Sequence, residues 1–213
     1  MSSARLLAPP LVVDPKRNYS VEEWLLIEEA TGERFEYHEG RLMPVNRMQG
    51  GTGTHALIGG NLVGSLFILA RAQRDVLPES SRCGVYSSDL RIMITTEKRY
   101  VYPDATVVCG EPIYDSKVPT AISNPILVAE VTSPSSDVYD HVDKFEYYSS
   151  LPTLRTYVIV SQNKPRVEVR ERREGAGAGW VTTVYDGTEA SVPLPALGGD
   201  LAAEDIYMLV RFE

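Results

Sequence analysis

The sequence has few of the residues that build disulfide frameworks and zinc sites. Cys83 and Cys109 are its only cysteines, and its three histidines are scattered along 213 residues. No cluster therefore has the spacing of a zinc site. Two isolated cysteines in apolar surroundings are typical of reduced, half-buried thiols in a cytosolic protein. We accordingly predict no disulfide and a cytoplasmic location.

Positive charge and long apolar runs are also scarce. The chain has 21 Lys and Arg against 29 Asp and Glu, a net charge of −8, which excludes a protein that coats nucleic acid through bulk electrostatics. A local basic surface could still meet DNA, with candidates at Arg47 and in the Arg166–Arg173 cluster. No apolar run approaches the ~18 residues of a membrane span, and the start of the chain is too proline-broken for a secretory signal. We expect no membrane partner.

The hydrophobic pattern alternates between strand-like and helix-like segments. Residues 1–18 carry three prolines without periodicity and are interpreted as a flexible lead-in; residues 19–213 are expected to form one domain. Helices are predicted at 21–30, 55–73 and 138–150. A hairpin is predicted at 35–45, and strands at 84–94, 100–109, 125–132, 155–161, 165–173, 179–185 and 189–193. The fold class is therefore α/β or α+β with a mixed sheet.

Three charged residues stand out against this background. Asp104 opens one strand-like run and Glu130 closes another, although carboxylates are depleted from strands and are seldom buried without a partner. Lys144 follows on a predicted helix. Two carboxylates on adjacent strands can hold Mg²⁺, which prefers oxygen ligands, and a lysine can orient water or offset developing negative charge. The set has the parts needed for phosphodiester hydrolysis.

Each of these residues also has an ordinary structural interpretation. Asp104 follows Pro103 and could simply start a strand, while Glu130 could pair with an arginine across the sheet. Lys144 lies four residues after Asp140, a common helical ion pair. However, the predicted helix face of Lys144 also carries two tyrosines and Leu151, which indicates a face turned inward.

The same residues resemble a known family. Pro103-Asp104 followed by Glu130-Val131-Thr132 is similar to the PD-(D/E)XK nuclease superfamily, with threonine where the superfamily has its lysine. The segment from Glu130 to Lys144 resembles the Uma-type restriction endonuclease family, largely of unknown function, in which the lysine has moved to the following helix. The resemblance covers about residues 20–175 and includes the hairpin motif around Glu36 and the histidine at position 55. Val158 and Ser161 depart from the residues that are usual in the family.

The resemblance implies a restriction-endonuclease-like fold: a mixed central sheet flanked by helices, with additional strands at the C-terminus. It implies that Asp104 and Glu130 bind Mg²⁺ (or Mn²⁺) and that Lys144 assists the nucleophile. Glu36 would be a catalytic residue that adds a metal or water ligand. His55, Asp89 and Asp140 would orient the residues that bind the metal. The expected partners are DNA and a second copy of the chain.

Two other functions remain open at this point. The chain could be a catalytically degenerate nuclease-fold protein that serves as an interaction or nucleic-acid-binding module. It could also be a metal-dependent hydrolase acting on another substrate. The acidic composition is compatible with both alternatives.

Overall fold

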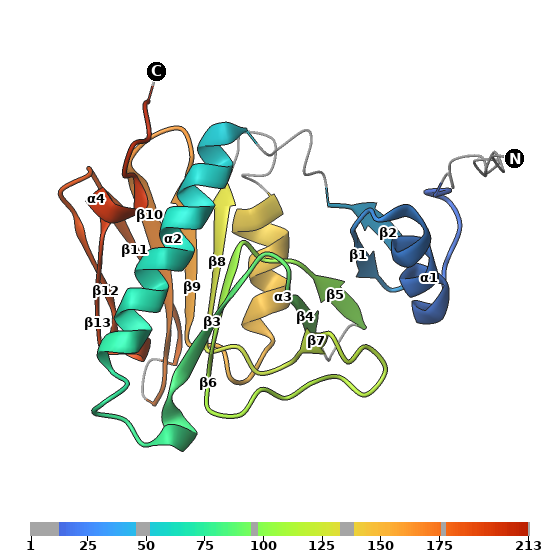
Figure 1. Cartoon of the computed structure of the whole chain (residues 1–213), viewed down its shortest axis with the longest axis horizontal. Helices are drawn as coiled ribbons and strands as arrows, with labels where there is room; N and C mark the ends of the chain where they lie inside the picture. Colours follow the sequence, from blue (N-terminus) through green and yellow to red (C-terminus); the bar gives the residue numbers. More distant parts are fainter. Residues whose placement is uncertain (1–12, 46–51, 95–97, 133–138, 176–177, 213) are drawn as a thin grey trace, which may run out of the picture.

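A six-stranded sheet with helices on both faces forms the centre of the molecule (Figure 1). The computed structural model describes residues 13–45, 52–94, 98–132, 139–175 and 178–212. The strand order of this sheet is β11-β10-β9-β8-β6-β3. Its strands are β3 (Cys83–Ser87), β6 (Ala105–Cys109), β8 (Leu127–Thr132), β9 (Thr156–Ser161), β10 (Arg166–Arg173) and β11 (Gly179–Asp186). Strands β8 and β9 are parallel, whereas the other neighbours are antiparallel. The predicted mixed sheet with flanking helices is confirmed.

A second sheet has five strands in the order β2-β1-β5-β4-β7. They are β1 (Phe35–His38), β2 (Arg41–Pro44), β4 (Arg91–Ile94), β5 (Arg99–Val101) and β7 (Ala121–Ile122). Two predicted strands were wrong in extent, because 84–94 and 100–109 each divide between the two sheets. The chain leaves the second sheet after Val101 and enters the first at Ala105. Asp104 lies at this crossing.

The helices follow the predicted pattern closely. Helix α1 (Val21–Thr31) begins at the capping box formed by Ser20 and Glu23, and helix α2 (Gly53–Ala72) begins at a Thr52 cap. The predicted helix 138–150 is a π-helix, η2 (Tyr139–Lys144), that continues into α3 (Phe145–Ser149). The C-terminal part adds β12 (Ser191–Leu194), β13 (Gly199–Ala202) and α4 (Ala203–Ile206). Short 3₁₀ turns, η1 (Glu79–Ser81) and η3 (Pro195–Leu197), complete the elements.

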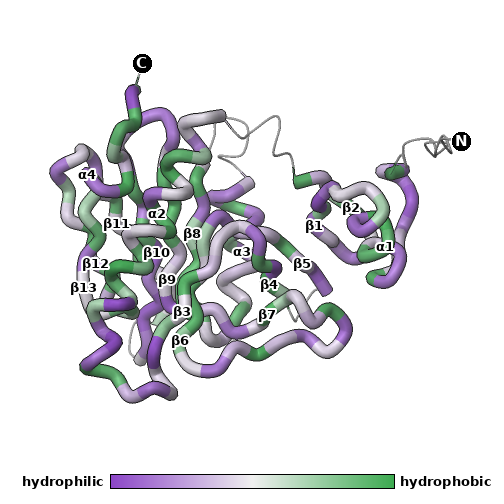
Figure 2. The backbone as a smooth tube through the Cα atoms, viewed as in Figure 1, coloured by the Kyte–Doolittle hydropathy of each residue, from purple (hydrophilic) through white to green (hydrophobic). Residues whose placement is uncertain are grey.

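Apolar side chains fill both faces of the six-stranded sheet. Odd-numbered residues of β6 and β8 pack with α2 and the C-terminal strands, and even-numbered ones pack beneath α3, as the alternation of a strand requires. A third cluster lies under α1 around Trp24. Figure 2 shows green, hydrophobic stretches along α2 and the strands behind it. Val13 packs against the third cluster, so the end of the predicted flexible lead-in is attached to the fold; residues 1–12 lie outside the described residues.

Helix α2 corrects the expectation that no apolar segment approaches the length of a membrane span. Among the described residues it is long and apolar enough to cross a membrane by length and composition alone. However, Ile58, Leu62, Leu66 and Ala70 are buried in the core against the sheet. Helices in the core of a globular protein pass the same test, so this finding is weak evidence for a span.

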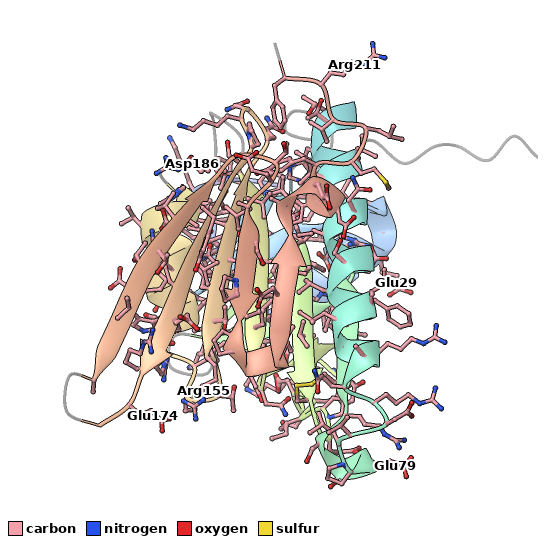
Figure 3. All side chains as sticks on the ribbon, turned by 90° about the vertical axis from the view of Figure 1, so that its left-hand side faces the viewer. Glu29, Glu79, Arg155, Glu174, Asp186 and Arg211 are labelled. Atoms are coloured by element: carbon pink, nitrogen blue, oxygen red, sulfur yellow. A yellow bond between two sulfur atoms is a disulfide. The ribbon has the colours of Figure 1, made fainter. Side chains whose placement is uncertain are left out.

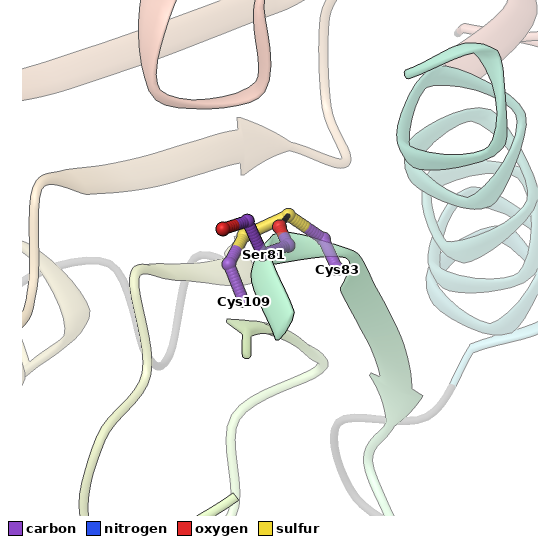
Figure 4. The surroundings of a disulfide bond; sticks show 3 residues. All are labelled: Ser81, Cys83 and Cys109. Atoms are coloured by element: carbon purple, nitrogen blue, oxygen red, sulfur yellow. Dashed lines mark hydrogen bonds between the residues drawn. A yellow bond between two sulfur atoms is a disulfide. The ribbon is translucent and has the colours of Figure 1, made fainter. Parts of the chain in front are cut away.

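The two cysteines contradict the prediction of free thiols. Cys83 and Cys109 form a disulfide between β3 and β6 (Figure 4). The prediction was wrong because the two residues are 26 positions apart in sequence, and only the antiparallel register of β3 and β6 places them directly opposite each other. Sequence spacing alone carries no information about that register.

Candidate active site

The ammonium group of Lys144 lies among three carboxylates. Lys144 Nζ is 3.1 Å from Glu130 Oε1, 3.4 Å from Asp140 Oδ1 and 3.7 Å from Glu36 Oε1. All four side chains are buried, with at most 9 % of any of them exposed. They come from β8, η2 and β1, so the cluster joins both sheets to the helix. We call these four residues the lysine cluster.

Asp104 lies next to the lysine cluster, near enough to Glu130 for its charge to raise the pKa of Glu130. It comes one residue before the Ala105–Ala129 pair of the antiparallel strands β6 and β8, and continuing this register by one step would set it opposite Glu130. Directly opposed residues of antiparallel strands share a face, with Cβ atoms about 4.5–5.5 Å apart. The backbone N–H of Val131 donates to Asp104 Oδ2 at 2.7 Å, which fixes the Asp104 carboxylate at the edge of the lysine cluster.

His55 approaches Asp104 from the first turn of α2. The distance from His55 Nε2 to Asp104 Oδ1 is 3.2 Å, and this contact raises the pKa of His55 above 6.5 through the hydrogen bond and the carboxylate charge, against the effect of burial. His55 and Asp104 are 24 % and 21 % exposed, which is more than any side chain of the lysine cluster. The open side of the site is therefore the Asp104 side.

The charges of the lysine cluster shift one another's pKa. Burial raises the pKa of Glu130 well above 4.5; Lys144 opposes this effect, and the nearby carboxylates of Asp140, Asp104 and Glu36 reinforce it. Burial lowers the pKa of Lys144, but attraction to the surrounding carboxylates outweighs burial and raises it well above 10.5. Lys144 is therefore an ammonium ion, whereas burial and the neighbouring carboxylates oppose the ionisation of Glu130.

Glu36 is held more firmly in its ionised form. Burial raises its pKa, but Lys144, His38 and Tyr139 together lower it below 4.5. The Tyr139 hydroxyl donates to Glu36 Oε2 at 2.9 Å, and His38 Nε2 lies 3.1 Å from the same oxygen. Glu36 is thus positioned by hydrogen bonds as well as by charge.

Several of these neighbours were not predicted as site residues. Tyr148 donates to Glu130 Oε1 at 3.0 Å, and its pKa is raised well above 10 by burial and by Glu130, so it remains a hydrogen-bond donor. Sequence spacing could have indicated two of them. His38 lies two residues after Glu36 on a strand, and Tyr148 lies four residues after Lys144 on a helix, so each shares a face with a predicted residue. For Tyr139 the sequence offers no comparable signal.

The structure therefore brings together six of the seven predicted site residues, namely Glu36, His55, Asp104, Glu130, Asp140 and Lys144. Asp89 is the exception: it is 69 % exposed and pairs with Arg34. It was misplaced because the predicted strand 84–94 divides between two sheets, and Asp89 lies in the turn between β3 and β4.

The predicted basic surface is only partly visible in the structure. Arg47 lies outside the described residues. In β10, Arg166 pairs with Asp186, Arg170 with Glu168 and Arg173 with Glu171. Arg172 donates to two backbone carbonyls at the C-terminal end of α3, those of Ser149 and Leu151. This cluster is therefore largely neutralised by its own neighbours.

Fold and site together define a protein of the nuclease-like α/β class. The model of the Uma2 family, described as "Putative restriction endonuclease", matches residues 21–204, and the chain belongs to this family. The predicted family membership is confirmed.

The chain also has sequence and structural relatives. The chain is 30 % identical over 198 residues to an uncharacterized protein of Synechocystis sp., slr1290, covering 93 % of this chain and 96 % of that one. It is 29 % identical over 182 residues to a second, sll1609, covering 85 % and 96 %. A crystal structure of a putative nuclease belonging to DUF820 from Anabaena variabilis superimposes with a TM-score of 0.64 at 19 % identity, over 89 % of this chain and 98 % of that chain. The two chains share their fold.

Proposed function

We propose that this protein is a metal-dependent endonuclease that hydrolyses phosphodiester bonds of DNA. The observation that carries the proposal is the surplus of carboxylates around Lys144. Glu130, Asp140 and Glu36 lie around a single lysine, and Asp104 lies next to them. Burial, reinforced by the charges of Asp140, Asp104 and Glu36, raises the pKa of Glu130 well above 4.5. A cation at Asp104 and Glu130 would relieve this repulsion.

The residues present fit Mg²⁺ better than a transition metal. Among the described residues, no group of three or more His, Cys, Asp or Glu side chains could hold a metal ion by itself. Mg²⁺ does not require such a group, because it keeps several waters and is usually held by one or two carboxylates together with substrate phosphate. Asp104 and Glu130 would supply those two carboxylates, and Mn²⁺ could replace Mg²⁺ there.

The protein's own side chains would have different roles in this reaction. When bound, the cation would polarise the phosphoryl oxygen and lower the pKa of a bound water. Lys144, protonated at Nζ, would donate a hydrogen bond to the attacking water or to the phosphoryl oxygens and offset their negative charge. Glu36, kept ionised by Lys144, His38 and Tyr139, would hold Lys144 in place through their ion pair. The substrate would enter on the more exposed Asp104 side.

A plasmid-nicking assay in Mg²⁺ and Mn²⁺ tests this function. We expect cleavage by the wild type, loss of cleavage in Glu130→Gln, and full cleavage in Glu189→Gln, which makes the same chemical change at an exposed position between β11 and β12. Calcium binding measured by calorimetry should disappear in Glu130→Gln alone. Equal activity in all three proteins would overturn the assignment.

One observation favours a second function. Lys144 makes three ion pairs with buried carboxylates, an arrangement that can also be purely structural in a catalytically degenerate nuclease fold. Duplex binding in calcium, which we expect to weaken steeply with salt, separates the two functions. If no binding appears even at about 50 mM salt, the protein is an interaction module instead.

A further inference from the structure

Strand β11 ends the six-stranded sheet and has no strand beyond it among the described residues. Figure 3 views the molecule from this side, with the β10–β11 hairpin at the outer edge, Asp186 labelled at one end and Glu174 at the other. β11 has eight residues, Gly179–Asp186, and contains neither a proline nor a charge before Asp186. Val181 and Val184 are 43 % and 38 % exposed, on opposite faces of the sheet.

The other sheet edges of the described structure are shorter. β2 has four residues and carries Arg41 and Pro44, β7 has two, and β3 has five. Short strands, charges and prolines are the features by which proteins prevent edge-to-edge pairing. β11 lacks all three over seven residues, so its free edge is suited to pairing with another strand.

The hydrogen-bond register identifies which backbone groups of β11 are unpaired. Gly187 N–H donates to Pro165 C=O, one register step beyond the Arg166–Asp186 pair. Because bonded and non-bonded pairs alternate between antiparallel strands, the odd-numbered residues of β11 bond to β10. The even-numbered residues therefore direct their N–H and C=O groups outward. They are Trp180, Thr182, Val184 and Asp186.

We propose that β11 pairs antiparallel with β11 of a second copy of this chain, joining the two sheets into one. Two copies related by a two-fold axis can form hydrogen bonds only between residues whose N–H and C=O groups both point outward. A register centred on Thr183 pairs all four of these residues. It pairs Thr182 with Val184 and Trp180 with Asp186 of the second copy. No outward N–H or C=O group of β11 is then left unpaired, which is the condition that a buried strand edge has to meet.

The side chains suit this self-pairing. Thr183 meets its own copy, and Val181 meets Tyr185 of the second copy; threonine–threonine and aromatic–β-branched pairs stabilise antiparallel strands. The single charged residue, Asp186, does not meet its own copy. Asp186 pairs with Arg166 of its own chain and would face Trp180 of the second copy. In each copy Arg172 stacks on the Trp180 indole at 4.9 Å, so a positive charge would lie close to Asp186. The charges across the interface are therefore complementary.

Cysteine crosslinking tests the register. The two native cysteines are already paired, so an introduced cysteine is the only free thiol. Under mild oxidation we expect Thr183→Cys to form a covalent dimer, because its two copies meet on the axis at a non-bonded pair, where side chains are closest. Thr182→Cys, an exposed neighbour on the other face, should crosslink far less. Crosslinking at Thr182 instead would overturn the register.

Two measurements on the uncrosslinked protein test the interface itself. Light scattering of the wild type should give twice the 23.6 kDa mass of the chain. Thr183→Lys should give the mass of one chain, because it sets two positive charges face to face. The control Thr188→Lys, in the exposed turn after β11, should still give the mass of two chains. Amide exchange should slow with concentration at Trp180, Thr182 and Val184, and remain unchanged at Val181 and Thr183. A monomer at all concentrations, or a dimer that survives Thr183→Lys, would overturn the proposal.

Discussion

Two groups of largely buried charged residues can be compared within the described residues, and they differ in charge balance. Under α1, Glu28 pairs with Arg91 and also accepts hydrogen bonds from Phe35 N–H and Tyr102 Oη, at 2.8 and 3.0 Å. Arg91 in turn lies over the Trp24 ring at 5.1 Å. One buried carboxylate thus meets one guanidinium, which is 16 % exposed. In the lysine cluster, by contrast, three carboxylates share one ammonium group, and Asp104 adds a fourth negative charge.

This difference separates a structural ion pair from a candidate site. A balanced buried pair with its hydrogen bonds satisfied holds elements together and needs no further ion. A surplus of buried carboxylates costs free energy in the unliganded protein, and such a cost persists mainly where function requires it. The comparison predicts opposite responses to the same Glu→Gln change in the two groups.

The largest expected effect is a loss of unfolding free energy when Glu28, the carboxylate on α1, is replaced. Glu28→Gln leaves the largely buried Arg91 guanidinium without its counterion. Breaking a fully buried pair costs about 3–5 kcal/mol of unfolding free energy, and the partial exposure of Arg91 reduces this cost. Denaturant unfolding in the presence of chelator measures this loss. Glu130→Gln should show no loss, because it removes a carboxyl group whose ionised form is opposed by burial and by the neighbouring carboxylates. If both variants lost similar stability, the lysine cluster would be a structural ion-pair group like the Glu28–Arg91 pair.

Catalysis should respond in the opposite way. Glu130→Gln or Asp104→Asn should reduce DNA cleavage by on the order of 10²–10³-fold, as removal of one electrostatic contributor commonly does. Glu28→Gln, assayed well below its melting temperature, should retain its activity. Initial nicking rates at saturating Mg²⁺ provide the measurement. Retained cleavage in Glu130→Gln would contradict the proposed role of the lysine cluster.

The pH dependence of stability should sharpen the contrast. A carboxyl group whose folded pKa is raised, such as Glu130, contributes stability below its unfolded pKa of about 4.3, and this contribution is lost as the pH rises through the folded pKa. The stability of Glu130→Gln relative to wild type should therefore increase with pH in metal-free buffer. Glu36, whose pKa is lowered, predicts the opposite trend for Glu36→Gln. Urea midpoints at several pH values, with Glu189→Gln as the control, measure both trends.

The smallest expected effect concerns His55. Its pKa should lie above 6.5 and should fall in Asp104→Asn, because Asp104 provides both the hydrogen bond and the charge that raise it. The associated stability is present below the unfolded pKa of about 6.5 and is lost as the pH rises through the folded value. NMR titration of the ring protons measures the shift. An unchanged pKa in Asp104→Asn would show that His55 does not respond to Asp104.

Much of the site could be predicted from the sequence because local chemistry marks it. A carboxylate inside an apolar strand, as Glu130 is in β8, needs a buried partner. A lysine on a helix face with tyrosines, as Lys144 is, points inward. The elements themselves were predictable where the pattern was regular, as in α1 with its capping box and the hairpin at Glu39-Gly40.

The amino-acid sequence by itself determined which residues are chemically unusual, the class of fold and the membership of the family. Only the tertiary structure decided what these residues meet, because strand register and sheet assignment depend on contacts between distant segments. Register pairs Cys83 with Cys109, and the antiparallel pairing of β6 with β8 brings Asp104 close to Glu130. The division of 84–94 between two sheets leaves Asp89 in an exposed turn, and the return of η2 over β8 brings Lys144 to the carboxylates.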